Sequence, residues 1–453
     1  MSHSDKIFKI AHISDLHLGK SLRSQDLAQD QSAVLEQIVE KIRALKLDLV
    51  VIAGDVFDRS IPSESAQTMF GWFMAELKRA LPQNGRILVI PGNHDSPKRI
   101  AFAAELFESV GIHLVSEILL SPTLVLEKGG KRAAVWALPF VTHGTYSEFK
   151  RRLAEEGQVE AGCTETISET ISSMASRMES IIANLRPSIA NQHTSESNLR
   201  PSIANITSQH PSESNLRPSE YNLNILVAHC YVRGAVLSES DIAFIGGTEA
   251  VPVSLFEAFD YVALGHLHKM QALSPKVWYS GAPMPMSFGD EGIEKGFLYV
   301  ELEDGEPARI ERVELKPLHV FKRVRASFAE LMADSAFIDD DYVEVLLTDE
   351  EPVYDAFNRL ALRFPNLMYV RQEAFEKRMG TEVEKVGDIA TLMPPNGETS
   401  SLDDTGNLAG KSLHTTVLND FISFTQRILD EPPSQELLKA FEVLLRNAEE
   451  ELS

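Results

Sequence analysis

The chain has 453 residues, two cysteines (Cys163 and Cys230) and a formal net charge of −23. This length suffices for two or three domains, and two cysteines cannot form a disulfide framework, which indicates a reducing, cytoplasmic environment. The acidic balance argues against a general affinity for nucleic acid. We also expect no membrane association, because no apolar run approaches the ~20 residues that cross a bilayer and no signal-peptide region precedes the first predicted strand.

Up to about residue 140, short apolar runs alternate with segments of helical apolar spacing. The predicted strands cover residues 9–13, 49–53 and 86–90, and the predicted helices cover 26–45, 63–80 and 97–110. Such repetition implies right-handed crossovers and a parallel sheet covered on both faces. Later strands have few helices between them, so we expect a second, antiparallel-rich layer. These later strands are predicted at 223–228, 261–264, 277–280 and 297–300.

Between the two groups of strands, Asn-Leu-Arg-Pro-Ser occurs three times, beginning at residues 184, 198 and 215. The units are short, unevenly spaced and poor in large apolar side chains, so they cannot stack into a core. We therefore predict a disordered or extended surface insertion at about 184–221, preceded by a helix at 167–183.

A different pattern begins at residue 318. Strands predicted at 320–328, 342–347 and 367–371 surround a helix at 353–363, which indicates an α+β module. A polar segment at 394–412 has the composition of a linker. Two helices are predicted after it, at 414–429 and 434–449. The apolar face of the last helix suits packing on the chain's own domain or docking to a partner.

Polar clusters follow several predicted strands directly. They are Asp15-Leu-His17, Gly54-Asp55-Val-Phe-Asp58, Gly92-Asn93-His94-Asp95, the single His229, and Gly265-His266-Leu-His268. In parallel sheets, ligands collect beyond the carboxyl ends of the strands, so carboxylates, imidazoles and one carboxamide are delivered to one place. Mixed oxygen and nitrogen donors suit divalent first-row metals, and these donors are too many for one ion. The clusters therefore predict a two-metal phosphoesterase.

Asp55 is the expected bridging ligand, because ions ~3.5–4 Å apart must share a donor. Asn93 can supply a neutral oxygen and leave the neighbouring His94 to act on substrate. His266 and His268 can lie on the same side of an extended segment, one for each ion.

Each residue also has a structural interpretation. A single histidine after a strand is often a structural one, and Asp58 could equally be a turn or capping residue. Asp95 is expected to cap the helix after Pro97 or to orient His94. His12 and Cys230 are expected in the core. The metal interpretation is favoured because all the motifs stand at strand ends.

In their order, these motifs resemble the calcineurin-like metallophosphoesterase superfamily. Segments 54–63, 265–271 and 279–288 are similar to the SbcD family, bacterial nuclease subunits of SbcC–SbcD complexes. The resemblance covers residues 6–160 and 222–330, and more loosely extends to about 375. It implies an α/β fold, a two-layer β-sandwich flanked by helices (α/β/β/α), with a smaller α+β capping domain and C-terminal helices. The implied domains are a nuclease domain (1–317), a DNA-facing capping domain (318–393), a linker (394–412) and a helical partner-binding segment (413–453).

The resemblance also implies the roles of the site residues. One manganese would be held by Asp15, His17, Asp55 and His268, and a second by Asp55, Asn93, His229 and His266, although magnesium or another divalent ion could replace manganese. The implied catalytic residues are His94, which would assist the leaving oxygen, and Asp58, which stands where some relatives have a second active-site histidine.

The implied function is manganese-dependent hydrolysis of DNA, as exonuclease and endonuclease, in double-strand-break repair and recombination. The implied partners are DNA and an SbcC-type, SMC-like ATPase, with two copies of the chain as a homodimer within a heterotetramer. Two alternatives remain open. A small-molecule phosphodiesterase, such as one acting on cyclic nucleotides, would use the same ligands without needing the module at 320–375. An inactive scaffold would lack a ligand, and none is missing.

Overall fold

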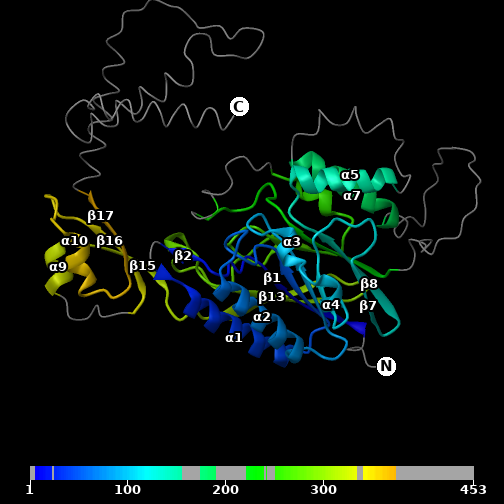
Figure 1. Ribbon diagram of the computed structural model, residues 1–453, viewed down its shortest axis with the longest axis horizontal. Coiled ribbons are helices and arrows are strands. Elements are labelled where there is room, and N and C mark those ends of the chain that lie inside the picture. Colours follow the sequence, from blue (N-terminus) through cyan, green and yellow to red (C-terminus); the bar gives the residue numbers. More distant parts are fainter. Residues whose placement is uncertain are drawn as a thin grey trace, which may run out of the picture. The chain divides into compact units, whose positions relative to one another are not determined.

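The computed structural model describes residues 6–22, 25–155, 174–189, 221–238, 241, 250–333 and 340–373 (Figure 1). The chain divides into two compact units, Met1–Lys377 and Arg378–Ser453, and all the described residues lie in the first. The expected linker at 394–412 and the terminal helices therefore lie outside the described residues. No helix in the described part of the chain is long and apolar enough to span a membrane.

The first of two six-stranded sheets has the order β14-β13-β1-β4-β5-β6. Its strands are β1 (Phe8–Ile13), β4 (Leu49–Ala53), β5 (Arg86–Ile90), β6 (Ile112–Leu114), β13 (Lys295–Leu302) and β14 (Arg309–Leu315). The four strands β1, β4, β5 and β6 pair in parallel, whereas β13 pairs antiparallel with β1 and with β14. The predicted parallel sheet is thus confirmed, with an antiparallel hairpin added at one edge.

The second sheet has the order β11-β12-β10-β9-β8-β7. Its strands are β7 (Leu124–Lys128), β8 (Lys131–Leu138), β9 (Leu223–His229), β10 (Tyr261–Gly265), β11 (Gln271–Ser274) and β12 (Val277–Tyr279). The expectation of an antiparallel-rich layer is wrong, because β8, β9, β10 and β12 pair in parallel and only the edge strands β7 and β11 are antiparallel. The prediction rested on the short spacing of these strands along the chain and assigned β13 to the second layer, whereas β13 pairs with β1 in the first sheet.

Helices cover the outer face of each sheet, so the layers are helix, sheet, sheet, helix (Figure 1). On the first sheet lie α1 (Ala28–Leu45) and α2 (Glu64–Ala80), and on the second lie α5 (His143–Glu155) and α7 (Met174–Ile189). The β4 sequence Leu-Val-Val-Ile-Ala is buried throughout, as expected for a strand covered on both faces. The predicted fold class is therefore confirmed.

The sheets pack on each other through their inner faces. Alternate strand residues such as Ile10, Val51, Ile225 and Ala263 form this inner core, while their neighbours face the helices. His12 lies in the same layer, fully buried, with Nδ1 2.8 Å from the hydroxyl of Tyr261. The prediction that His12 is a core residue is confirmed.

A smaller module follows β14. It has a three-stranded parallel sheet of β15 (Phe321–Ala326), β16 (Tyr342–Leu347) and β17 (Leu367–Gln372), with helices α9 (Phe328–Ala333) and α10 (Ala356–Ala361) packed on one face. Asp30 of α1 joins this module to the main body. Its fully buried carboxylate accepts hydrogen bonds from the backbone N–H of His319 at 2.9 Å and the hydroxyl of Tyr342 at 2.7 Å.

Two helix predictions need correction. The helix expected at 97–110 is broken into α3 (Pro97–Ile100) and α4 (Ala104–Glu108), because Ala103 adopts a left-handed conformation with φ of 57°. Helix α7 continues to Ile189, past the predicted end at residue 183, so the first Asn-Leu-Arg-Pro-Ser copy lies within a helix. The other two copies lie outside the described residues. Short elements complete the described chain: β2 (Ser21–Leu22), β3 (Gln25–Asp26) and the 3₁₀ turns η4 (Val253–Phe256) and η5 (Phe288–Asp290).

Candidate metal centre

The predicted site residues gather where five strands of the two sheets end. Strands β1, β4 and β5 lead into residues 15–17, 54–58 and 92–95, and β9 and β10 lead into His229 and residues 265–268. The two sheets approach each other closely at this point. The ring Nδ1 of His229 donates to the carbonyl of Ala53 at 2.9 Å, and a Cβ on Gly265 would lie 1.9 Å from the same oxygen. Glycine is therefore required at 265, because any side chain there would prevent the ends of β4 and β10 from approaching closely enough to bring the predicted ligands together.

The backbone is strained where the ligands stand. Asp15, His17 and Asp55 have left-handed φ angles of 54°, 44° and 49°, a conformation that costs a non-glycine residue of order 1–3 kcal/mol. Backbone hydrogen bonds between the loop after β1 and the loop after β4 hold this conformation. The N–H of Asp15 donates to the backbone carbonyl of Gly54 at 3.0 Å, and the N–H of His17 donates to the backbone carbonyl of Asp55 at 2.9 Å.

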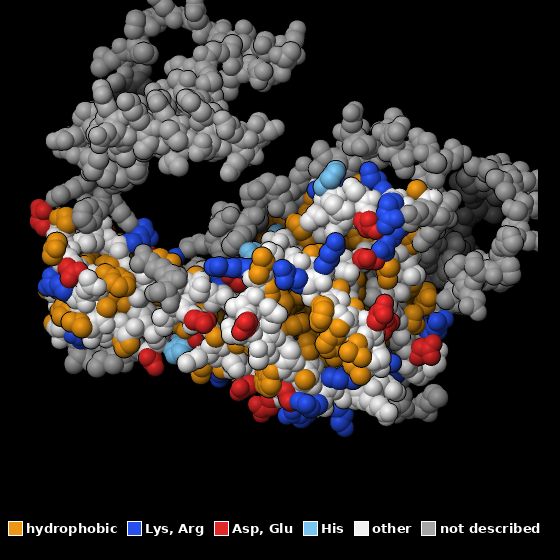
Figure 2. Space-filling view, viewed as in Figure 1, with side chains coloured by type: hydrophobic (Ala, Val, Ile, Leu, Met, Phe, Trp, Pro, Cys, Tyr) orange, Lys and Arg blue, Asp and Glu red, His pale blue; other side chains and the backbone are white. Residues whose placement is uncertain are grey.

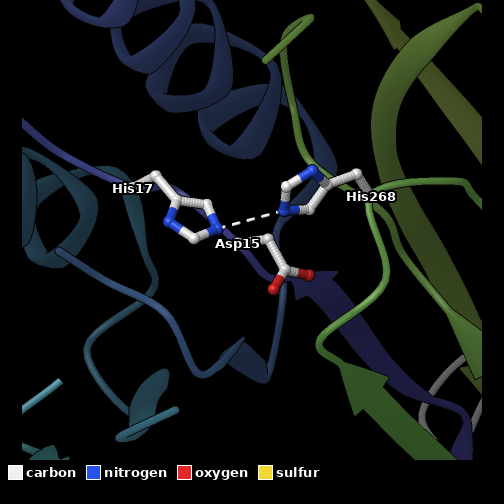
Figure 3. A group of neighbouring side chains, drawn as sticks. All are labelled: Asp15, His17 and His268. Carbon is white, nitrogen blue, oxygen red and sulfur yellow. Dashed lines mark hydrogen bonds between the residues drawn. The ribbon is translucent and has the colours of Figure 1, made fainter. Parts of the chain in front are cut away.

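One group of potential ligands comprises Asp15, His17 and His268, all buried (Figure 3). The Nε2 atoms of the two imidazoles face each other at 3.1 Å, with the Asp15 carboxylate beside them. At most one of two facing ring nitrogens can donate to the other, whereas both can bind a shared cation.

A second group comprises Asp55, His229 and His266. The side-chain oxygen of Asn93 lies 3.0 Å from His229 Nε2 and 2.9 Å from His266 Nδ1. Asp55 lies between the two groups, because its Oδ2 is 3.4 Å from His229 Nε2 and 3.7 Å from His17 Nε2. The structure therefore brings all seven predicted ligands together, with Asp55 in the shared position.

Burial and charge set the protonation of the group around Asp55. Burial opposes ionisation of Asp55, but the charge and hydrogen bond of His229 together hold the pKa of Asp55 below its ordinary value. Burial likewise opposes the charge on His229, yet Asp55 and Asp15 raise the pKa of His229 to about 9. Burial, together with the charge of Asp55, raises the pKa of Asp15 to about 8.

Burial has the opposite effect on the remaining imidazoles. It lowers the pKa of His266 to about 3 and holds the pKa values of His17 and His268 below the ordinary value. These three rings are therefore neutral near neutral pH, which is the form that binds metals. The buried Nε2 of His266 has no hydrogen-bond partner among the described residues. The set of oxygen and nitrogen donors, with these three imidazoles neutral, thus fits a pair of divalent cations.

His94 and Asp58 lie at the side of the cluster. His94 Nδ1 is 2.9 Å from the backbone carbonyl of Asp58, and because a carbonyl can only accept, Nδ1 must carry the proton. The carboxylate of Asp58 lies 3.6 Å from His17 Nδ1 and 3.0 Å from Lys20 Nζ. Burial opposes its ionisation, but His17 and Lys20 lower the pKa of Asp58 to about 2. Asp58 thus stands behind His17, on the opposite ring nitrogen from the one facing His268.

Two residues support the ligand loops in ways that the sequence did not predict. The carboxylate of Asp95 accepts the N–H groups of Val56, Phe57 and Gly92 at 2.9–3.0 Å, so it ties two ligand loops together and does not cap the following helix. Gln31 of α1 donates to the carbonyl of His17 at 2.7 Å. Only Asp95 belonged to a visible motif; nothing in the periodicity of α1 marked Gln31.

Phe140 lies beside the same site, and Cys230 follows the ligand His229 in the chain. The half-buried ring of Phe140 lies 6.1 Å and 6.3 Å from the rings of His229 and His266. Cys230 is fully buried, as predicted, and burial raises the pKa of its thiol to about 12. The groups of potential metal ligands among the described residues do not include Cys230, although it follows His229 in the chain.

The fold and the site define a metallophosphoesterase. Residues 8–270 match the model of the calcineurin-like phosphoesterase family, and the chain belongs to this family. Among solved structures, the chain is similar to a dimetal phosphatase from Danio rerio, with 12% sequence identity and a TM-score of 0.35 over 68% of this chain and 99% of that one.

Proposed function

We propose that this chain is the nuclease subunit of an SbcC–SbcD-type complex and hydrolyses DNA phosphodiester bonds with two manganese ions. The observation that carries the proposal is the position of Asp55 between the two histidine groups, with His94 beside them. Bound divalent cations supply Lewis acidity at the phosphate oxygens and acidify the attacking water. Asp15, His17 and His268 would hold one cation, Asn93, His229 and His266 the other, and Asp55 both.

His94 is the proposed proton donor to the leaving oxygen. Its Nδ1 proton is directed at the carbonyl of Asp58, which leaves Nε2 as the nitrogen that exchanges a proton with substrate. The backbone N–H of His94 also donates to Asp55 Oδ1 at 2.9 Å, so the shared ligand and the proposed acid are held next to each other. Asp58 would act on the reaction through His17 and His94, whose orientations it fixes.

The small module supports DNA as the substrate over a small molecule. Its helices cover the sheet face that bears Val343 and Val345, so the alternating residues Arg323, Arg325 and Arg371 occupy the other face, with side chains 42%, 66% and 55% exposed. These arginines contact Glu344 and Glu373, and basic and acidic side chains are interspersed on the face shown in Figure 2. A net charge of −23 with no continuous basic band on this view favours a partner that supplies much of the attraction to DNA.

A broken helical segment supports assembly into a homodimer. Three residues in or next to α4 form an exposed apolar group: Phe102, Leu106 and Val110 are 79%, 72% and 52% exposed, and apolar side chains gather over α3 and α4 (Figure 2). Exposed Lys98 precedes this apolar group in the chain, and exposed Glu108 lies between Leu106 and Val110. Two antiparallel copies would pair the apolar groups and bring opposite charges together, as an isologous contact requires.

The test is cleavage of linear duplex and hairpin DNA with manganese, with and without the ATPase. Cleavage that requires manganese and is stimulated by the ATPase is expected. Turnover of cyclic nucleotides with no DNA cleavage would establish the small-molecule alternative. Deleting residues 413–453 should abolish co-purification with the ATPase and leave manganese-dependent hydrolysis of small phosphodiesters intact.

A further inference from the structure

Behind the candidate metal centre lies a buried ion pair that the proposed chemistry does not use. Lys295 begins β13, and Asp290 ends the turn η5. Their side chains are 3% and 0% exposed, and Lys295 Nζ lies 3.0 Å from Asp290 Oδ1. The other oxygen of Asp290 accepts the N–H of Met286 at 2.8 Å. Each charge is therefore compensated inside the protein.

The lysine of this pair contacts the main chain of a predicted ligand. Lys295 Nζ donates to the carbonyl of His268 at 3.1 Å, and the N–H of Ala282 donates to the same oxygen at 3.1 Å. On the other side, the N–H of His268 donates to the buried carboxylate of Asp241 at 3.2 Å. His268 is thus held at both of its backbone polar groups, in part by charged side chains that lie outside the set of ligands.

The surrounding packing leaves His268 little room to shift. Gly281 has a left-handed φ of 72°, and a Cβ there would lie 2.8 Å from the His268 carbonyl and 2.6 Å from the N–H nitrogen of Met270. The backbone of residues 268–270 therefore packs directly against the backbone of Gly281. A small change in the carbonyl position would move the ring, whose Nε2 is 3.1 Å from His17 Nε2.

Stability alone does not account for this pair. Taking two charges out of water is so unfavourable that apolar residues of similar size are often as stabilising as a buried ion pair. An apolar side chain at 295 could not donate a hydrogen bond to His268. We propose that Lys295, held in place by Asp290, is a positioning residue that sets the orientation of His268 as a metal ligand. This inference rests on the proposed two-cation site but not on the identity of the substrate.

The test is a neutral pair, Asp290→Asn with Lys295→Met, in the full-length chain. Asparagine can still accept the N–H of Met286, and methionine fills much of the volume of the lysine stem, so the fold should be retained. We expect one of two manganese ions to bind ~10–100-fold more weakly, the range typical of lost outer-sphere contacts. Calorimetric titration with manganese chloride and electron paramagnetic resonance count the ions, and His268→Ala identifies the cation affected.

A matched control is the half-exposed ion pair of Asp48 and Lys128, whose charged atoms lie 2.8 Å apart. Asp48 precedes β4, at the end of that strand away from the candidate metal centre. Asp48→Asn with Lys128→Met should leave both manganese affinities unchanged. Two wild-type affinities in the 290/295 variant, at an unchanged melting temperature, would overturn the inference. If that variant does not fold, Asp290→Asn alone decides by the same criterion. A wild-type chain that binds fewer than two ions would instead refute the proposed function.

Discussion

Replacing His94 with alanine should separate catalysis from metal binding. The side chain is half-buried and donates a hydrogen bond from Nδ1 to the backbone carbonyl of Asp58 at 2.9 Å, and loss of this hydrogen bond should cost about 1 kcal/mol of stability. The backbone N–H that contacts Asp55 is retained in the variant. Loss of a general acid typically lowers turnover ~10²–10⁴-fold, or about 2.7–5.4 kcal/mol of transition-state stabilisation.

The assay compares two leaving groups under single-turnover conditions with saturating manganese. An oligonucleotide leaves as a poor, strongly basic alkoxide, whereas bis(p-nitrophenyl) phosphate releases a stable phenolate that needs little protonation. His94→Ala should therefore slow DNA cleavage far more than hydrolysis of the activated ester. Equal losses on both substrates would refute the general-acid role, as would a variant that no longer binds manganese.

Three further predictions follow from the structure. Because His229 and Asp15 have pKa values of about 9 and 8, cation binding near neutral pH should release on the order of two protons, and the affinity for the cations should rise with pH up to about 9. Calorimetry in buffers of different ionisation enthalpy measures the proton release, and a cation affinity that does not change with pH would contradict the prediction. Leu106→Asp places a charge in the exposed apolar group and should yield a monomer by light scattering, with the melting temperature unchanged; a dimer that persists in this variant would show that the copies contact each other elsewhere. Asp30→Ala leaves buried donors such as the Tyr342 hydroxyl unpaired and should lower the free energy of unfolding by about 2–4 kcal/mol; a urea-denaturation loss below ~1 kcal/mol would show that this contact contributes little.

The sequence predicted the site better than the details of the fold around it. Strands such as Leu49–Ala53 are buried on both faces, so they appear as continuous apolar runs whose ends are easy to find. Since parallel strands end at the same edge, the polar residues after them could be placed together. The bridging position predicted for Asp55 agrees with its location between the two histidine groups.

Features imposed by tertiary contacts could not be predicted. The left-handed backbone at Asp15 and His17 depends on hydrogen bonds to the loop after β4, which no local propensity encodes. The apolar spacing through Phe102 and Leu106 continues across the break between α3 and α4, so periodicity gave no warning that Ala103 is left-handed. Likewise, a lysine at the start of a strand is usually solvated, and nothing local marked Lys295 as buried.

The most direct test of the central claim is the number of manganese ions bound per chain, measured by elemental analysis of the wild type and of Asp55→Asn. Asp55 Oδ2 lies within 3.4 Å and 3.7 Å of imidazoles from the two groups, so we expect two ions in the wild type and weakened binding of both in the variant. A wild-type chain with at most one ion, or a variant that still binds two ions tightly, would contradict the shared-ligand site.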